Sequence, residues 1–425
     1  MADTTRPYEL VLLGANGYTG KMTAEHIAQY LPTDLKWAIA GRSSKKLADV
    51  AEELKKLNPD RLPPSIEICE LKKDELDTLV KKTRIVITTI GPFMKYGEPV
   101  VEACANSGTH YLDCTGEVPW VKDMIEKYDE TAKKNGAIMI PQCGLDSVPA
   151  DLLAYILSRH IRSTLSAPTA SVIVSLHAFK SGISGGTANT MLDLFDHYPL
   201  SHLGASMKPY ALSPVQPMAP TPPPSSGLLH RLLGIRYVPE LGTLTDGLMA
   251  SVDTSIAHRS WGLYTQSPDP DAAYGPRFRF TEYMRAKNTF TAALIHYAFL
   301  LGFSLLLLPP TRALLSPLLR RRLPLPGAGP AKDAIKKEFL NYRAVGVADT
   351  QRGERALARL EFGGGAYMLT GVTLAEAAMV MLRGDLGATE AGRRGGGLLT
   401  PATLGDQFVE RLKKVGVKIE VRMGE

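Results

Sequence analysis

The sequence predicts an α/β protein, with an N-terminal doubly wound parallel sheet followed by a second, α+β domain that contains a mixed or antiparallel sheet. From residue 8 to about residue 145, short apolar segments alternate with amphipathic ones, as strands and helices do in a parallel sheet. After residue 151, longer segments rich in β-branched residues are typical of antiparallel strands. The chain of 425 residues is long enough for more than one core.

The expected elements fall into three segments, residues 1–150, 151–370 and 371–425. In the first we expect strands at 8–13, 37–40, 65–70, 85–90, 110–113 and 137–141, with helices at 21–31, 45–57, 73–82, 98–107 and 120–134. A helix at 148–158 leads into the second, where we expect a helix at 188–197, a proline-rich loop at 209–226, and strands at 169–179, 247–258, 277–283, 339–348 and 355–362. The third should pack back on the core through helices at 373–383 and 404–415 and a strand at 417–421.

Composition excludes several classes of function. The net charge of +6 is modest, and the basic residues are not interleaved with aromatic ones, so we expect no nucleic-acid partner. The four cysteines show no metal-ligand spacing and fit a reducing compartment, and we expect no metal. Residues 1–7 contain no apolar segment that would predict a secretory signal.

A glycine-rich turn follows the first apolar strand and opens the first helix. Its spacing is G-x-x-G-x-x-G, which departs from the commoner G-x-G-x-x-G. Such a turn brings the N–H groups and the positive dipole end of the helix to a pyrophosphate. The motif therefore predicts a dinucleotide site in a Rossmann domain, with an ordinary strand-to-helix turn as the alternative. The predicted cofactor-binding residues of this turn are Gly14, Asn16, Gly17, Tyr18, Thr19 and Gly20.

The end of the second strand indicates which dinucleotide binds. An NAD enzyme carries an acidic residue there to hold the ribose 2′-hydroxyl, whereas this chain has Arg42 and Ser43. A guanidinium and a hydroxyl suit a 2′-phosphate. We therefore predict NADP(H), with a solvated loop arginine as the alternative reading of Arg42.

An apolar segment at 290–308 departs from the rest of the chain. It carries no charge, ends at Pro309 and Pro310, and has basic residues on both sides, namely Arg285, Lys287, Arg312 and the run at 320–322. A membrane-spanning helix needs about 20 apolar residues, so the length is borderline. We expect this segment to lie on a membrane or lipid-droplet surface as a peripheral or monotopic anchor facing the cytoplasm. The alternative is a buried core helix.

Several short motifs, taken in order, resemble those of the saccharopine dehydrogenase-like oxidoreductases, in the branch that includes the trans-acting enoyl reductases. The resemblance covers almost the full length. Besides the turn at 14–20, the motifs are Ala-Gly-Arg at 40–42, Gly-Pro-Phe-x-x-Tyr-Gly at 91–97, the run from 103 to 117, Cys-Gly-x-Asp-Ser-x-Pro-x-Asp at 143–151, and Ser-Gly-Gly-Thr at 184–187. The resemblance implies a Rossmann domain, a second domain with a large sheet, and an NADP(H)-linked reaction.

For function, the resemblance implies reduction of a C=C bond in a lipid-like or polyketide-like enoyl substrate, free or carrier-bound. One alternative is a saccharopine-type dehydrogenase acting on a charged imine, although Asp113, Glu117 and Asp146 would repel a dicarboxylate and only His258 and Arg259 could supply an anion site. The other is a nucleotide-binding scaffold on a lipid surface without catalysis. The sequence does not decide the oligomeric state, and a homodimer is one of the alternatives.

Candidate catalytic residues follow from that chemistry. Reduction of an activated C=C needs a proton donor, for which we select Tyr96; the alternative is that it packs over the cofactor or lines its loop. Asp113 could orient the donor, although Asp113 and Glu117 could also cap the following helix. Cys143 is interpreted as structural.

Further contacts are expected at two turns. We expect Thr89, Gly91 and Pro92, at the end of the fourth strand, to contact the cofactor. The second-domain motif, which could hold a substrate carbonyl oxygen or form a simple turn, consists of Ser184, Gly185, Gly186 and Thr187.

Overall fold

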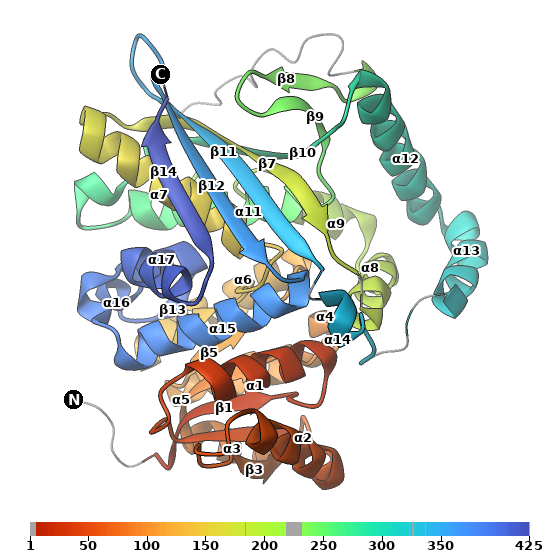
Figure 1. The fold of residues 1–425 in the computed structure, drawn as a ribbon, viewed down its shortest axis with the longest axis vertical. Helices are drawn as coiled ribbons and strands as arrows, with labels where there is room; N and C mark the ends of the chain where they lie inside the picture. The colour runs from red at the N-terminus through yellow and green to blue at the C-terminus, as the bar shows by residue number, and fades with distance from the viewer. Residues whose placement is uncertain are drawn as a thin grey trace.

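Two seven-stranded sheets organise the computed structural model, which describes residues 6–424 except 183, 218–231, 323, 325, 326 and 336. The sheet built mainly from the N-terminal segment is called sheet A, and the other is called sheet B. Helices pack against both sheets, and the C-terminal segment lies between them (Figure 1). Half of the expected loop at 209–226, residues 218–226, lies outside the described residues.

Sheet A is entirely parallel, as the sequence predicts, with the order β13-β6-β5-β4-β1-β2-β3. Its strands are β1 (Tyr8–Leu13), β2 (Trp37–Gly41), β3 (Ser65–Ile68), β4 (Thr83–Thr88), β5 (His110–Asp113), β6 (Ile138–Ile140) and β13 (Gly397–Leu398). The connecting helices are α1 (Tyr18–Tyr30), α2 (Ser44–Leu57), α3 (Lys73–Lys81), α4 (Phe93–Tyr96), α5 (Glu98–Ser107) and α6 (Val118–Asn135). The strand order reverses between β1 and β4, and ligands bind such sheets in the crevice at that point.

Sheet B is mixed, because β7 and β10 pair in parallel while its other neighbours are antiparallel. Its order is β14-β12-β11-β7-β10-β9-β8. The strands are β7 (Thr169–Lys180), β8 (Arg236–Val238), β9 (Gly242–Asp246), β10 (Arg279–Arg285), β11 (Phe339–Ala348), β12 (Arg355–Gly363) and β14 (Lys418–Met423).

In the second half, one expected strand is wrong and several elements, such as β8 and β9, were not predicted. The expected strand at 247–258 is wrong, because these residues form the start of α11 (Ala250–Thr265). Nearly every residue from 252 to 264 is buried, so the apolar positions show no helical period that the sequence could reveal. The other helices are α7 (Val148–Leu165), α8 (Gly185–His197), α9 (Leu200–Ser206), α12 (Thr289–Leu307), α13 (Pro309–Arg322), α14 (Lys332–Ile335), α15 (Ala366–Arg383), α16 (Glu390–Arg394) and α17 (Gly405–Lys414).

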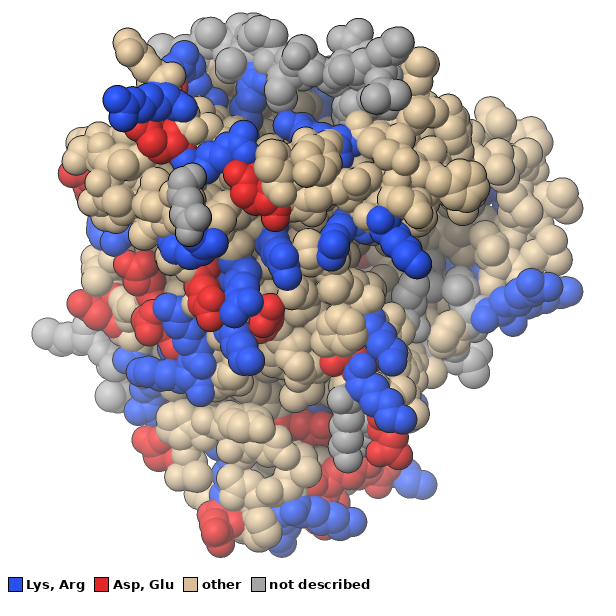
Figure 2. All heavy atoms as spheres, turned by 45° about the horizontal axis from the view of Figure 1, so that its top comes forward, with Lys and Arg blue, Asp and Glu red and all other residues tan. Residues whose placement is uncertain are grey.

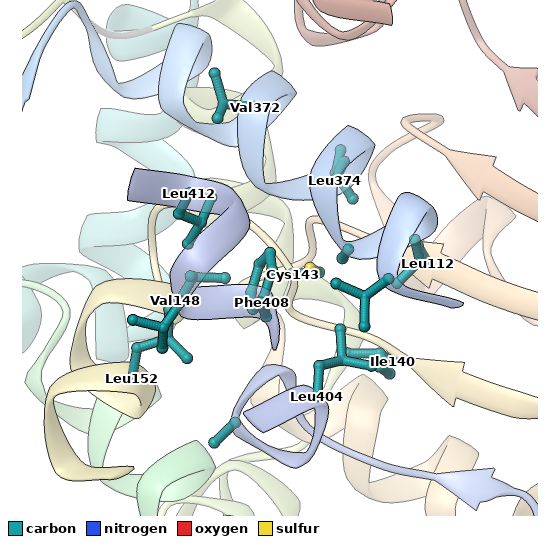
Figure 3. Close-up of a cluster of buried hydrophobic side chains, with 14 of the residues drawn as sticks. Leu112, Ile140, Cys143, Val148, Leu152, Val372, Leu374, Leu404, Phe408 and Leu412 are labelled. Carbon is teal, nitrogen blue, oxygen red and sulfur yellow. The ribbon is translucent and has the colours of Figure 1, made fainter. Parts of the chain in front are cut away.

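The C-terminal segment is built into both halves of the molecule. It adds β13 to the edge of sheet A beside β6 and β14 to the edge of sheet B beside β12, and α15 packs on α1. Figure 3 shows the apolar cluster where these parts meet, with side chains from β5, β6, α7, α15 and α17. Each large side chain buried there contributes about 1.5–3 kcal/mol of hydrophobic stabilisation, so the two sheets share one core.

Candidate functional site

The predicted cofactor residues come together at the carboxyl edge of sheet A. β1 lies between β2 and β4 in register, so the turns that follow these three strands are neighbours. The turn at 14–20 follows β1, Arg42 and Ser43 follow β2, and residues 89–92 follow β4. The switch point of the strand order therefore lies inside the predicted site.

The glycine turn has the close geometry that a phosphate-binding turn requires. Gly14 has a φ of +91°, and a Cβ on it would come within 2.7 Å of Ile90 Cγ1. A Cβ on Gly20 would come within 2.2 Å of the Gly14 carbonyl oxygen, so no other residue fits there without moving the backbone. Gly17 is the N-cap residue of α1, without a side-chain cap. The open N-terminus of α1 thus fits the pyrophosphate of a dinucleotide.

Tyr18, within this turn, uses its side chain to contact the second half of the chain. Its hydroxyl donates to the carbonyl oxygen of Pro330 at 2.8 Å, and its ring lies edge-on to Tyr367 with 5.1 Å between ring centroids. The Thr19 carbonyl accepts from the Thr23 hydroxyl. Because the Tyr18 hydroxyl is committed to Pro330, its backbone N–H group at the helix N-terminus is the donor left for a cofactor contact.

At the end of β2, Arg42 is exposed and Ser43 caps a helix. The Ser43 hydroxyl accepts from the backbone N–H of Lys46 at 3.4 Å, which makes it the N-cap of α2. Arg42 lies near Glu70. The pKa of Glu70 is lowered mainly by Lys72 and to a smaller extent by Arg42. Asn16 lies beside this strand end, since a Cβ on Gly41 would approach its Oδ1 to 3.5 Å. Arg42 is exposed at the strand end where the sequence predicts a 2′-phosphate, whereas the Ser43 hydroxyl oxygen already accepts one hydrogen bond.

The turn after β4 supports the glycine turn. The Thr89 hydroxyl donates to the Gly14 carbonyl oxygen at 3.2 Å, and the peptide bond between Gly91 and Pro92 is cis. Tyr96 ends α4 and is 46% exposed, and no described residue forms a hydrogen bond with its hydroxyl. The predicted donor is thus accessible at the edge of the crevice, but no neighbour orients it.

Asp113 and Glu117 are buried and occupied by hydrogen bonds. Asp113 accepts from the backbone N–H groups of Thr115 and Gln142 and from the Tyr111 hydroxyl, so it joins the ends of β5 and β6. Glu117 accepts from the N–H groups of Phe93 and Met94 at 2.8 and 2.6 Å.

These contacts correct the expected capping role and define a structural one. Glu117 precedes α6 yet makes no cap there; it holds the N-terminus of α4 instead. Burial raises the pKa of Asp113 to about 6 and of Glu117 to about 7, despite these donors. Because every contact of Asp113 is internal, the catalytic part of our prediction rests on Tyr96.

The remaining sequence candidates have clear places. Cys143 is buried, with its thiol 3.8 Å from the Thr373 carbonyl oxygen, and burial raises its pKa, which fits a structural cysteine. Arg259 cannot form the expected anion site, because it is 4% exposed and its guanidinium donates to the carbonyls of Leu212 and Leu398.

The second-domain motif forms the start of α8. Ser184 is the N-cap residue, since its hydroxyl accepts from the N–H of Thr187 at 3.4 Å. Its own N–H donates to the Tyr367 hydroxyl at 2.7 Å, and the Gly185 N–H donates to the Ala328 carbonyl at 3.1 Å. Gly186 is exposed. Most donors of the motif are therefore used internally, and Tyr367 links it to Tyr18 of the cofactor turn.

A link that the sequence could not reveal joins α8 to the cofactor side. Asp193 of α8 accepts from Lys95 of α4 at 2.6 Å and from Arg320 of α13 at 2.5 Å. Residues distant in sequence thus fix α4, and with it Tyr96, relative to the second half of the chain.

Comparisons with known proteins agree with this architecture. Residues 10–140 match the model of the saccharopine dehydrogenase NADP binding domain. A Mycobacterium tuberculosis protein named "Putative trans-acting enoyl reductase" is 34% identical, with 99% of each chain covered. A "Trans-acting enoyl reductase" of Mycobacterium ulcerans is 30% identical, again with 99% of each chain covered.

A solved structure shows the same fold. The saccharopine dehydrogenase (L-Glu forming) of Saccharomyces cerevisiae superposes with a TM-score of 0.51 at 14% identity, covering 98% of this chain and 100% of that one. Fold and site together define an NADP-binding oxidoreductase. The chain belongs to the saccharopine dehydrogenase-like family, in the branch that contains the trans-acting enoyl reductases.

Proposed function

We propose that the protein uses NADPH to reduce an activated C=C bond in a lipid-like or polyketide-like enoyl substrate, presented free or on a carrier. The observation that carries this proposal is full-length similarity to proteins named as enoyl reductases, with the whole second domain retained. NADPH bound at the edge of sheet A would supply the hydride. The glycine turn would hold its pyrophosphate and Arg42 its 2′-phosphate.

The alternative substrate, a charged imine, is less well supported. A saccharopine-type substrate carries several carboxylates, which require arginines or lysines in the site. Arg259 is committed to backbone carbonyls, while the nearby motifs contribute Asp113, Glu117 and Asp146. Buried carboxyls beside the crevice and an arginine that is already committed disfavour a dicarboxylate and are compatible with an uncharged enoyl group.

The test is NADPH oxidation by the purified protein with a panel of enoyl thioesters and, separately, with α-aminoadipate semialdehyde plus glutamate. We expect turnover with enoyl thioesters and none with the second pair. Turnover only with the second pair would support the saccharopine-type reaction instead. NADPH binding without turnover of any substrate would support a scaffold without catalysis.

A second proposal concerns α12 and α13, which we call the apolar hairpin. Only 6% of the apolar stretch of α12 is buried, so the alternative of a buried core helix is wrong. Its exposed side chains include Phe290, Leu294, Tyr297, Leu300, Leu301, Phe303, Leu307 and Leu308, continued by Leu314, Leu318 and Leu319. Figure 2 shows the largely uncharged surface on the side of the molecule where α12 lies. We propose that this surface rests on a membrane or lipid droplet from the cytoplasmic side.

The charges around the apolar hairpin refine the expected anchor. Arg312 pairs with Asp196 at 3.0 Å and Arg320 pairs with Asp193, so both are held by α8. Arg321 and Arg322 are exposed and, within the described chain, have no acidic partner. These two arginines, together with the exposed Lys287, are therefore the charges we assign to anionic headgroups.

A further inference from the structure

A carboxyl pair and a tyrosine lie in the second domain, outside every motif named in the sequence. Asp253 is in the first turn of α11, Glu282 is in β10 and Tyr342 is in β11, with 2%, 3% and 2% of their surfaces exposed. Glu282 pairs with Val174 and Tyr342 with Leu176 on the intervening strand β7. Since these β7 positions are two residues apart, Glu282 and Tyr342 project from the same face of sheet B.

The hydrogen bonding of this pair differs from that of other buried carboxyls. Asp113 accepts three hydrogen bonds, and Asp151 accepts from the Ser260 hydroxyl and the Ala402 N–H. By contrast, in the part of the chain that the structure describes, no other residue donates to either oxygen of Glu282 or to Oδ1 of Asp253, and the two carboxyls interact with each other instead. Buried carboxyls that only stabilise a fold normally accept hydrogen bonds from neighbouring groups, as Asp113 and Asp151 do. The carboxyl pair departs from this rule, and the departure calls for another explanation.

The Tyr342 hydroxyl is a second, independent group aimed at the same place. No hydrogen-bond partner for it exists among the residues described, although its ring is buried in sheet B. Burial raises its pKa well above its usual value, and the carboxyls of Glu282, Asp253 and Asp146 raise it further. The phenol therefore keeps its proton and remains a donor without an acceptor.

The position of Asp146 relates the carboxyl pair and Tyr342 to the crevice. It belongs to the loop that follows β6, and a Cβ on Gly116, in the loop that follows β5, would come within 3.3 Å of its Oδ2. Those loops form the carboxyl edge of sheet A beyond β4, and the Asp146 charge reaches both Asp253 and Glu282. The carboxyl pair and Tyr342 thus lie near the Asp146 loop, one of the loops that border the predicted cofactor site.

Burial also sets the protonation of the pair. Loss of solvent contact is the main cause that raises the pKa of Glu282, to about 7. The same effect, together with the charge of Glu282, raises the pKa of Asp253 well above its usual range. Asp146 and Asp151 raise the pKa of Asp253 in the same direction. One carboxyl therefore retains a proton near neutral pH, as a general acid requires.

We propose that Asp253 and Glu282, in place of the sequence-predicted donor Tyr96, share the proton that is delivered to the substrate, and that the Tyr342 hydroxyl binds the substrate carbonyl oxygen beside them. This inference rests on the proposed enoyl reduction. The substrate β-carbon receives the hydride from NADPH, and the electrons of the C=C bond move toward the carbonyl, where Tyr342 donates a hydrogen bond. The carboxyl proton then forms the new C–H bond at the α-carbon. The pair regains its proton from solvent, and the cofactor would be released as NADP⁺.

The experiment compares Glu282→Gln and Asp253→Asn with Asp151→Asn, a control at a buried carboxyl that has its donors. Activity is measured with the enoyl substrate that the wild type turns over. We expect Glu282→Gln and Asp253→Asn to lower kcat at least about 100-fold, the range of general-acid catalysis, with NADPH affinity changed less than about twofold. Tyr342→Phe should lower kcat by about tenfold, the scale of one lost hydrogen bond.

Thermal melting supplies a readout that does not depend on activity. Because the folded pKa of Glu282 lies above its ordinary value of 4.5, wild-type stability should fall as pH rises from about 4.5 to about 7. Glu282→Gln removes the ionisable group, so its melting temperature should exceed that of the wild type at pH 8. Burial also raises the pKa of Asp151 to about 7, but Asp151→Asn should lose stability because it disrupts the hydrogen bonds from the Ser260 hydroxyl and the Ala402 N–H.

The possible failures are distinguishable. A lower melting temperature for Glu282→Gln at pH 8 would overturn the proposal, because it would make the pair structural. Full activity of both pair variants would overturn it while leaving enoyl reduction standing. A wild type that reduces no enoyl substrate would overturn the proposed function and this inference with it.

Discussion

The helices α12 and α15 have similar length and composition but opposite surroundings. Both are long and apolar enough to cross a membrane, with mean hydropathies of 1.9 and 1.2. The apolar stretch of α15 is 78% buried, whereas that of α12 is 6% buried. α15 packs on α1, the helix of the cofactor turn, while α12 is attached to β9 along one side, where the Thr245 hydroxyl donates to the Ala292 carbonyl and His296 contacts Asp246. Hydropathy therefore identifies an apolar helix but does not decide what covers it.

The largest expected effect comes from placing a charge on each helix. Val380 of α15 is fully buried and Leu301 of α12 is 61% exposed. We expect Val380→Asp to cost more than about 4 kcal/mol, because an unpaired carboxylate would be buried, and Leu301→Asp to change stability by less than about 0.5 kcal/mol. Chemical denaturation of both variants measures the difference. Equal losses would mean that α12 is covered by protein in solution, for instance in a dimer.

The pattern of hydrophobicity predicted most of this architecture, and the exceptions have identifiable physical causes. The turn at 14–20 and the strands of sheet A follow from local periodicity and turn chemistry, and β11 falls on the expected residues 339–348. α11 was missed because it is buried on almost every side, and Asp253 was missed with it. β13 has only two residues, and its place beside β6 depends on contacts remote in sequence. Which carboxyls have donors, as Asp113 does and Glu282 does not, is likewise set by tertiary packing.

A second pair of variants tests what each helix touches. A Cβ on Gly371 of α15 would come within 2.9 Å of the backbone of Met22 and Thr23 in α1, whereas a Cβ on Gly302 of α12 meets nothing within 4 Å. Gly371→Ala should therefore displace α1 at a cost of about 1–3 kcal/mol and weaken NADPH binding. Gly302→Ala should stabilise the protein by about 0.5–1 kcal/mol through helix propensity and leave NADPH binding unchanged. Fluorescence titration with NADPH and thermal melting measure both effects. Weakened NADPH binding in Gly302→Ala would contradict the expectation that α15, and not α12, supports the cofactor turn.

The smallest effect concerns the lipid surface that we propose for α12, and it separates the contribution of charge from that of apolar contact. Arg321 and Arg322 follow the apolar hairpin and are exposed, whereas Arg352, at the opposite end of β11, is an exposed arginine remote from it in sequence. Each arginine near an anionic surface contributes about 1 kcal/mol, so Arg321→Gln with Arg322→Gln should weaken binding to anionic liposomes by roughly 30-fold, and Arg352→Gln should not. The difference in affinity between wild type and double variant should shrink at high salt, because the Debye screening length falls to about 3 Å at 1 M. It should vanish on neutral liposomes. Flotation of the wild type and the variants on both liposome types measures these affinities. Binding that needs neither the arginines nor anionic lipid would assign the attachment to the leucine and phenylalanine side chains of α12 alone, and a wild type that never floats would contradict the lipid surface itself.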